Sequence, residues 1–213
     1  MASTRLRAEL CAAEQRLAAA DPIMAQLIHN TGACQLGARK RDPLDTLVGS
    51  IVSQQLSVKA ADTIFARLRA AAGGQPYLQP AALLQLSTEE LRAVGLSRAK
   101  ARYVQAVTEA QLSGELDWKA IRRADDETAI TLLTRLPGVG RWTAEMLLIF
   151  QLDRLDIFAV GDLGLRRAVE SLYRKGKPIT DLGLKRITNR WRPVRSVASW
   201  YLWRHVDPET QTW

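Results

Sequence analysis

Residues 136–141 combine the features of a segment that binds a phosphate group through its backbone. A predicted helix ends at the first of these residues, and Pro137 prevents it from continuing. Gly138 and Gly140 permit backbone angles that are closed to other residues, and they let a ligand approach the chain. The next helix begins near Arg141, and its first amides are unpaired and carry the positive end of the helix dipole. The segment therefore predicts a helix–hairpin–helix that binds a phosphate.

Asp162 is the acidic side chain whose position suggests catalysis. It opens a predicted helix about twenty residues after the hairpin, which is one helix length plus a turn. A carboxylate there could stabilise the positive charge that develops on a sugar when a glycosidic bond breaks, and it could orient or deprotonate a water molecule. An Asp at such a place is also a routine helix cap, and this alternative stays open. Asp153 and Asp156 lie nearer the hairpin but flank a polar turn, and we predict that they are solvated or cap a helix.

The composition favours a polyanionic partner. The chain has 213 residues and a net charge of +8, from 30 basic and 22 acidic side chains. This balance is typical of proteins that bind nucleic acid or an anionic membrane surface, although a basic soluble protein without such a partner has it too. Cys11 and Cys34 are too few for a disulfide framework, a zinc ribbon or a four-cysteine iron–sulfur cluster. We predict that they are buried thiols in a reducing compartment, and we expect no signal peptide and no transmembrane segment.

The spacing of apolar residues is helical along almost the whole chain, and strand-like alternation is missing. Asp21-Pro22 and Asp42-Pro43 each place a capping side chain before a proline in the first helical turn. Residues 87–90 read as a capping box. We predict thirteen short helices between residues 3 and 206, including helices over 43–56 and 162–174. The sequence therefore predicts an all-α fold.

The motifs together resemble a known family. The run LPGVGRWTA at 136–144, followed by FAVGD at 158–162, resembles the helix–hairpin–helix (HhH-GPD) DNA glycosylase superfamily. More narrowly, residues 42–61 and 191–203 are also similar to the 3-methyladenine DNA glycosylase II (AlkA-type) family. The resemblance covers roughly residues 40–206. It implies a two-lobed all-α fold with the active-site cleft between the lobes, one lobe being residues 45–155 and the other residues 1–44 with 156–213.

The resemblance implies that Asp162 is the catalytic carboxylate of a DNA glycosylase. Bifunctional glycosylases also cut the backbone through a Lys amine that forms a Schiff base. In the families that Asp162 and the hairpin resemble, that Lys directly follows the Gly-Arg of the hairpin, where this chain has Trp142. An indole cannot form an imine. We therefore expect simple hydrolysis without strand cleavage.

The resemblance also implies a base pocket formed by Trp142, Trp203 and Met146. A flipped base is held by stacking, and an indole face attracts a cationic alkylated base. The alternative is that these tryptophans are ordinary core residues, as we predict for Trp191 and Trp200. Met146 stands where the family often has Tyr, which leaves the range of lesions open.

The gap left by a flipped base must be filled, and the resemblance assigns this wedge to the loop after the helix over 43–56. By register Gln55 occupies the wedge position, where the best-known branch has Leu. Gln54 and Leu56 are the neighbouring candidates. The alternative is two exposed amides at a helix end.

Further expectations concern the backbone of the hairpin. We expect DNA phosphate to be bound by Gly138, Val139, Gly140, Arg141 and Thr143. The resemblance also places three backbone carbonyls around a monovalent cation (Na⁺ or K⁺), namely those of Thr134, Leu136 and Val139. Carbonyl oxygens suit such a hard ion. No other cofactor is expected.

The resemblance implies a base-flipping glycosylase for alkylated bases such as 3-methyladenine and 7-methylguanine in double-stranded DNA, the first step of base excision repair. We expect it to be a monomer without a membrane partner, located in the cytoplasm of a bacterium or the nucleus of a eukaryote. Two alternatives remain open: a non-catalytic helix–hairpin–helix DNA-binding module, and a glycosylase for another damaged base.

Overall fold

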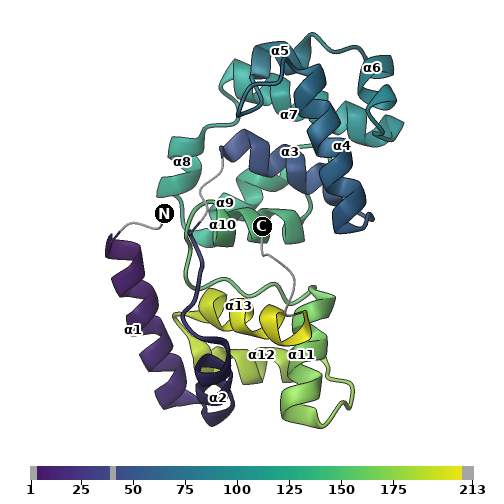
Figure 1. The fold of residues 1–213 in the computed structure, drawn as a ribbon. Helices are drawn as coiled ribbons and strands as arrows, with labels where there is room; N and C mark the ends of the chain where they lie inside the picture. The colour runs from purple at the N-terminus through teal and green to yellow at the C-terminus, as the bar shows by residue number, and fades with distance from the viewer. Residues whose placement is uncertain (1–3, 39–41, 208–213) are drawn as a thin grey trace. The chain divides into compact units, whose positions relative to one another are not determined.

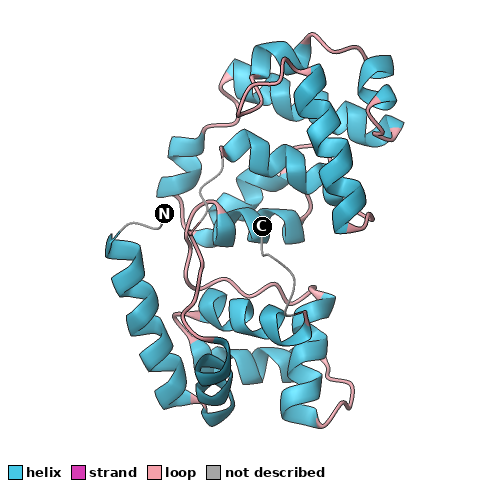
Figure 2. Cartoon of the chain, in the orientation of Figure 1, coloured by secondary structure: helices cyan, strands magenta, loops and turns pink. Residues whose placement is uncertain are grey.

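The computed structural model of the chain describes residues 4–38 and 42–207. Within these ranges the chain forms thirteen α-helices and one short 3-10 helix, and no strand is present (Figure 1, Figure 2). The prediction of an all-α fold is therefore confirmed. None of the helices in the same ranges is long and apolar enough to cross a membrane. The chain divides into two compact units: Met1–Lys40 with Leu148–Trp213, here called the Asp162 unit, and Arg41–Leu147, here called the hairpin unit.

The hairpin unit is built around α7. Its helices are α3 (Pro43–Ser53), α4 (Val58–Ala71), α5 (Pro80–Leu84), α6 (Thr88–Ala93), α7 (Arg98–Ser113), α8 (Trp118–Arg123), α9 (Asp126–Thr134) and most of α10 (Arg141–Phe150). α7 packs against α3, α5 and α6, and α3 also packs against α4. The predicted capping box is present, because Ser87 Oγ accepts from Glu90 N and the Glu90 carboxylate accepts from Ser87 N. The apolar face of α3 is closed from solvent, with Leu47, Val48 and Ile51 fully buried.

The Asp162 unit is built around α13. Its elements are α1 (Thr4–Ala20), α2 (Pro22–Thr31), α11 (Leu163–Arg174), α12 (Asp181–Thr188), the 3-10 helix η1 (Asn189–Trp191) and α13 (Arg195–Val206). α13 packs against α11, α2 and α1 (Figure 1). Seven consecutive residues of α13, numbers 196–202, are buried, so this helix is the centre of the unit. Trp191 and Trp200 are buried, which confirms their prediction as core residues.

The cysteines differ from their prediction. Cys11 is exposed, because α1 turns Leu6, Leu10 and Leu17 toward the core and leaves Cys11 on its other face. Cys34 is half-buried, and burial raises the pKa of its thiol to about 12. The prediction of two buried thiols is therefore wrong for Cys11.

Asp21 joins distant elements of the Asp162 unit at one buried carboxylate. It is 1% exposed. It accepts four hydrogen bonds, from Ile23 N at 3.0 Å, Met24 N at 3.4 Å, Tyr173 Oη at 2.9 Å and Trp191 Nε1 at 3.0 Å. Arg190 Nη2 lies 3.4 Å from the same carboxylate. One side chain thus caps α2 and ties it to α11 and η1.

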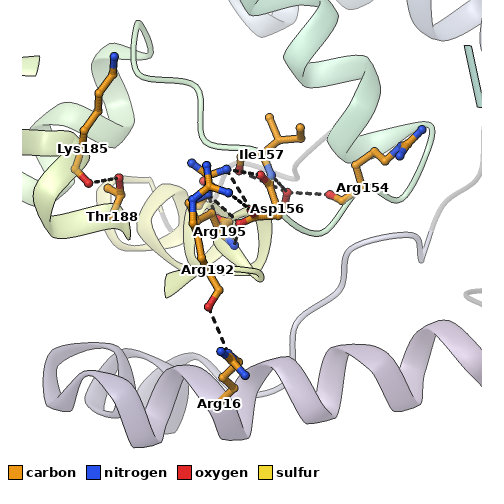
Figure 3. A network of polar contacts seen from close by, with 10 residues as sticks. Arg16, Arg154, Asp156, Ile157, Lys185, Thr188, Arg192 and Arg195 are labelled. Atoms are coloured by element: carbon orange, nitrogen blue, oxygen red, sulfur yellow. Dashed lines mark hydrogen bonds and ion pairs between the residues drawn. The ribbon is translucent and has the colours of Figure 1, made fainter. Parts of the chain in front are cut away.

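A second polar network fixes the chain that leads to Asp162 (Figure 3). Asp156 accepts from Arg195 Nε at 2.7 Å and from Arg192 Nη1 at 2.9 Å, and it also accepts from the backbone amide of Arg195 at 3.4 Å. Ser196 Oγ accepts from Ile157 N at 2.9 Å and donates to Arg154 O at 2.7 Å. Asp156 was predicted to be solvated or to cap a helix; its side chain is 20% exposed, and its contacts are mainly with the side chains of Arg192 and Arg195. The loop is therefore held against the start of α13.

Candidate active site

The predicted hairpin is present between α9 and α10. Val139 N donates to Leu136 O at 3.1 Å and closes the turn, so this amide is used inside the hairpin. Gly138 has a φ of +81°, and a Cβ there would lie 2.3 Å from Tyr103 Cδ2. Only glycine fits this position. Gly140 differs from the prediction, because its φ is ordinary and a Cβ would meet nothing within 4 Å. Its missing side chain leaves open space beside the first turn of α10.

The first turn of α10 begins at this open place. Ala144 N donates to Gly140 O at 3.0 Å and closes the turn, which makes Gly140 the residue before the helix. The amides of a first turn have no partner within their own helix. The side chain of Thr143 is buried, at 2% exposure. The phosphate contact predicted for Thr143 is therefore left to its backbone amide.

Arg141 pairs with two carboxylates. Its Nη1 and Nη2 donate to the two oxygens of Glu127 at 2.9 and 2.6 Å, and its Nε donates to Glu145 at 3.0 Å. The hydrogen bonds with Glu127 raise the pKa of Arg141, and those with Arg141 lower the pKa of Glu127. Sequence reasoning assigned Arg141 to a phosphate, and it could not foresee acceptors supplied by α9.

The loop between α3 and α4 distinguishes the three wedge candidates. Gln54 is half-buried, and its Nε2 donates to Gly138 O of the hairpin at 2.9 Å. Gln55 is exposed and has a φ of +58°. Leu56 is 40% exposed. The predicted helix over 43–56 ends at Ser53, because Gln54 leaves the helical region with a ψ of 126° and Gln55 follows with a left-handed φ of +58°.

Asp162 and Trp203 are brought together in the Asp162 unit. Asp162 is the N-cap of α11, as predicted, and its Oδ1 accepts from Leu165 N at 2.8 Å. The same oxygen accepts from Trp203 Nε1 at 3.2 Å. The ring of Phe150 lies against that of Trp203, with centroids 5.6 Å apart. A half-buried carboxylate thus lies at the positive end of a helix, beside an indole ring.

Gly164 is a part of this arrangement that sequence reasoning missed. A Cβ at Gly164 would lie 3.1 Å from Asp162 Oδ1 and 3.5 Å from Trp203 Cδ1. The distance to Trp203 is an ordinary contact, but the distance to Asp162 is shorter than most Cβ contacts, so a side chain here would press on the carboxylate. Its place two residues after Asp162 was the only signal in the sequence.

The remaining predicted residues lie on α10 or at the hairpin. Trp142 is half-buried and Met146 is buried, at 3% exposure, one helical turn further along. Both belong to the hairpin unit. Of the three carbonyls predicted for a cation, that of Leu136 accepts the Val139 amide and keeps a second lone pair. No group of three or more His, Cys, Asp or Glu side chains that could hold a metal occurs among the described residues.

The geometry agrees with comparisons to known proteins. Residues 48–199 match the model of a family described as "HhH-GPD superfamily base excision DNA repair protein". The chain belongs to the HhH-GPD superfamily. The match begins in α3 and ends in α13, so it spans the Gln54–Leu56 loop, the hairpin and Asp162.

The similar members of the HhH-GPD superfamily include glycosylases from a yeast and a bacterium. DNA-3-methyladenine glycosylase 1 of Schizosaccharomyces pombe is 35% identical over 166 residues, which is 78% of this chain and 73% of that protein. The crystal structure of a DNA-3-methyladenine glycosidase from Bacillus halodurans is 38% identical, with a TM-score of 0.82, over 92% of this chain and 89% of that one. A 3-methyladenine DNA glycosylase of Schizosaccharomyces pombe in complex with abasic DNA is 32% identical, with a TM-score of 0.82, over 90% of this chain and 95% of that one.

Proposed function

We propose that this chain is a monofunctional DNA glycosylase that hydrolyses the N-glycosidic bond of alkylated bases in duplex DNA. The observation that carries the proposal is the Asp162 carboxylate, held against Trp203 at the start of α11. Two similar proteins named 3-methyladenine glycosylases support the substrate class. Alkylated bases such as 3-methyladenine and 7-methylguanine carry positive charge and leave readily, so a strong general acid is not required.

Asp162 supplies the negative charge that the reaction needs. Positive charge develops on the deoxyribose as the bond to the base breaks, and a carboxylate placed near C1′ stabilises it. The hydrogen bonds from Leu165 N and Trp203 Nε1 both reach Oδ1, so the carboxylate is oriented before the base arrives. Preorganised charge of this kind lowers the barrier without a reorganisation cost during the reaction. The same carboxylate can orient or deprotonate the attacking water.

The candidates for stacking on the flipped base are Trp203 in the Asp162 unit and Trp142 in the hairpin unit. A half-buried indole offers a ring face for stacking, and it attracts a cationic base. Met146 lies one turn along α10 from Trp142, on the same helix face. Because Met146 is buried, we propose that it supports Trp142 and does not itself stack on the base.

The hairpin would bind the DNA backbone through its amides. Arg141 already pairs with Glu127 and Glu145, so we assign the phosphate to the amides of Gly140, Arg141 and Thr143. Such contacts position a protein on DNA and read no sequence. The carbonyl oxygens of Thr134, Leu136 and Val139 are ligands that suit a hard monovalent cation, and such a cation would neutralise their partial negative charges.

The wedge would be Gln55, with Leu56 beside it. Both side chains are exposed, whereas the Gln54 amide is engaged with the hairpin. A Gln side chain can fill the space of an extruded base and hydrogen-bond to the base left without its partner.

An excision assay tests the reaction and its type together. We expect base release from duplexes with 3-methyladenine or 7-methylguanine, and a panel with hypoxanthine and ethenoadenine will define the lesion range. Trp142 stands where a lyase needs an amine, so strands should break only after alkali treatment, and borohydride should trap no protein–DNA adduct. Adduct formation would refute monofunctionality, and absence of release from every duplex would refute the glycosylase itself.

Gly164→Ala is expected to slow excision without destabilising the protein. The added methyl would lie 3.1 Å from Asp162 Oδ1, so the carboxylate must shift by a few tenths of an ångström. A misplaced catalytic group of this kind should reduce the single-turnover rate by roughly tenfold. The melting temperature should not fall, because Ala is the better helix former.

Gly161→Ala is the matched control for this variant. A Cβ at Gly161 meets nothing within 4 Å and its φ is ordinary, so we expect excision close to that of the unmodified protein. If Gly164→Ala is as fast as Gly161→Ala, the contact between Asp162 and Trp203 does not set the rate.

A further inference from the structure

Lys100 contacts the end of α3 from a neighbouring helix. Its Nζ donates to Val52 O at 2.8 Å and to Gln54 O at 2.6 Å. The last carbonyls of a helix have no partner within it, and a lysine is a favourable group there. Lys100 itself lies in the first turn of α7, where the helix dipole disfavours a cation. Its position is therefore explained by α3 and not by its own helix.

The next turn of α7 also supports the hairpin. Tyr103 lies three residues after Lys100, on the same helix face, and its ring packs against Gly138. Gly138 O in turn accepts from Gln54 Nε2 at 2.9 Å. The loop, the hairpin and α7 thus form one closed set of contacts within the hairpin unit.

These contacts hold Gln55 in a conformation that it would rarely adopt alone. A φ of +58° is unfavourable for a residue with a side chain, so neighbouring contacts must maintain it. On one side, the backbone carbonyl of Gln54 accepts from Lys100, and the side-chain amide of Gln54 donates to the backbone carbonyl of Gly138. On the other side, Leu56 N donates to Ser53 O at 3.1 Å. The side chain of Gln55 is exposed and can meet a partner.

We propose that Lys100 is the positioning residue of the wedge: its two hydrogen bonds to the end of α3 fix Gln55 outward, while the Gln54 side chain joins the same loop to the hairpin. This inference rests on the proposed function. Lys100 would then act on base extrusion through Gln55, without contacting DNA. Its ammonium is turned toward two protein carbonyls, so it is not offered to a phosphate.

The test compares excision of a paired lesion with excision of the same lesion in a one-nucleotide bulge. A bulged base has no partner and leaves no gap when it is extruded, so it needs no wedge. Lys100→Met should reduce the single-turnover rate by about tenfold on the paired duplex and by less than about twofold on the bulge. Affinity for undamaged duplex and its salt dependence should not change, because no phosphate contact is lost.

Lys119→Met is the matched control, since it removes one charge from an exposed position on α8. It should leave both rates unchanged. Gln55→Ala should show the same selective loss as Lys100→Met, and the double variant should be no slower than the slower single variant, because residues acting through one element are not additive.

Equal losses on both substrates, additive losses in the double variant, or a reduced salt dependence of binding would overturn the proposal. If Lys100→Met does not fold, Gln54→Met breaks only the contact with Gly138 and must show the selective loss. If the unmodified protein excises the lesion and Gln55→Ala excises it at the same rate as the unmodified protein on both substrates, the wedge and this inference fail together. If the unmodified protein releases no base from either substrate, it is the proposed function that fails.

Discussion

Replacing Asp162 by Asn is expected to reduce single-turnover excision by about a thousandfold, the effect of losing one preorganised group that stabilises developing charge. Asn keeps the shape of the side chain and an oxygen that can accept from Leu165 N and Trp203 Nε1. Asn is also a good helix cap, so α11 should begin where it does now. Only the negative charge is lost. Affinity for duplex DNA should therefore survive, because the hairpin and not Asp162 is proposed to hold the backbone.

Asp153→Asn removes the same charge elsewhere in the Asp162 unit and serves as the control. Asp153 has a φ of +55°, a conformation that Asn tolerates well, so the substitution should not strain the chain. We expect its excision rate to match that of the unmodified protein. Excision by Asp162→Asn within tenfold of that rate would contradict the assignment of Asp162 as the catalytic carboxylate.

Replacing Asp21 by Ala is expected to lower the free energy of unfolding by roughly 3–5 kcal/mol. The substitution removes the cap of α2 and leaves the Trp191 indole and the Tyr173 hydroxyl without their acceptor. Trp191 is fully buried, so its N–H cannot turn to water. The measurement is thermal unfolding followed by circular dichroism, where a loss of this size should lower the melting temperature by roughly 10 °C.

Asp42→Ala provides a close comparison, because Asp42 is also followed by a proline and caps α3. Within residues 4–38 and 42–207, its carboxylate accepts from Leu44 N and Asp45 N, at 2.9 and 3.3 Å. Losing a simple cap should cost about 1 kcal/mol. If the two variants are equally stable, the contacts of Asp21 with Tyr173 and Trp191 contribute little, and its role is that of an ordinary cap.

The sequence was sufficient where the determining interactions are short-range. The caps at Asp21, Asp42 and Asp162, and the capping box at Ser87, were predicted correctly because each joins residues two or three positions apart. Helical periodicity was sufficient for the all-α fold for the same reason. The family followed from motifs that are themselves local: the hairpin and the Asp after it.

Long charged side chains were harder to assign. Arg141 was predicted to meet a phosphate, and it pairs with Glu127, fourteen residues earlier in the chain. No role was predicted for Lys100, and it donates hydrogen bonds to the backbone carbonyls of Val52 and Gln54. A flexible charged side chain reaches whichever acceptor the packing brings near, so its partner depends on how α3, α7, α9 and α10 meet.

The sequence by itself determined the helices, their caps, the hairpin and the family, because these depend on residue types and on spacings of a few residues. Only the tertiary structure decided which side chains meet. It placed the Trp203 indole on the Asp162 carboxylate across 41 positions, ended α3 at Ser53, and turned Gln54 toward the hairpin while leaving Gln55 exposed. Each of these outcomes depends on contacts between elements distant in the chain, which packing creates and local spacing does not encode.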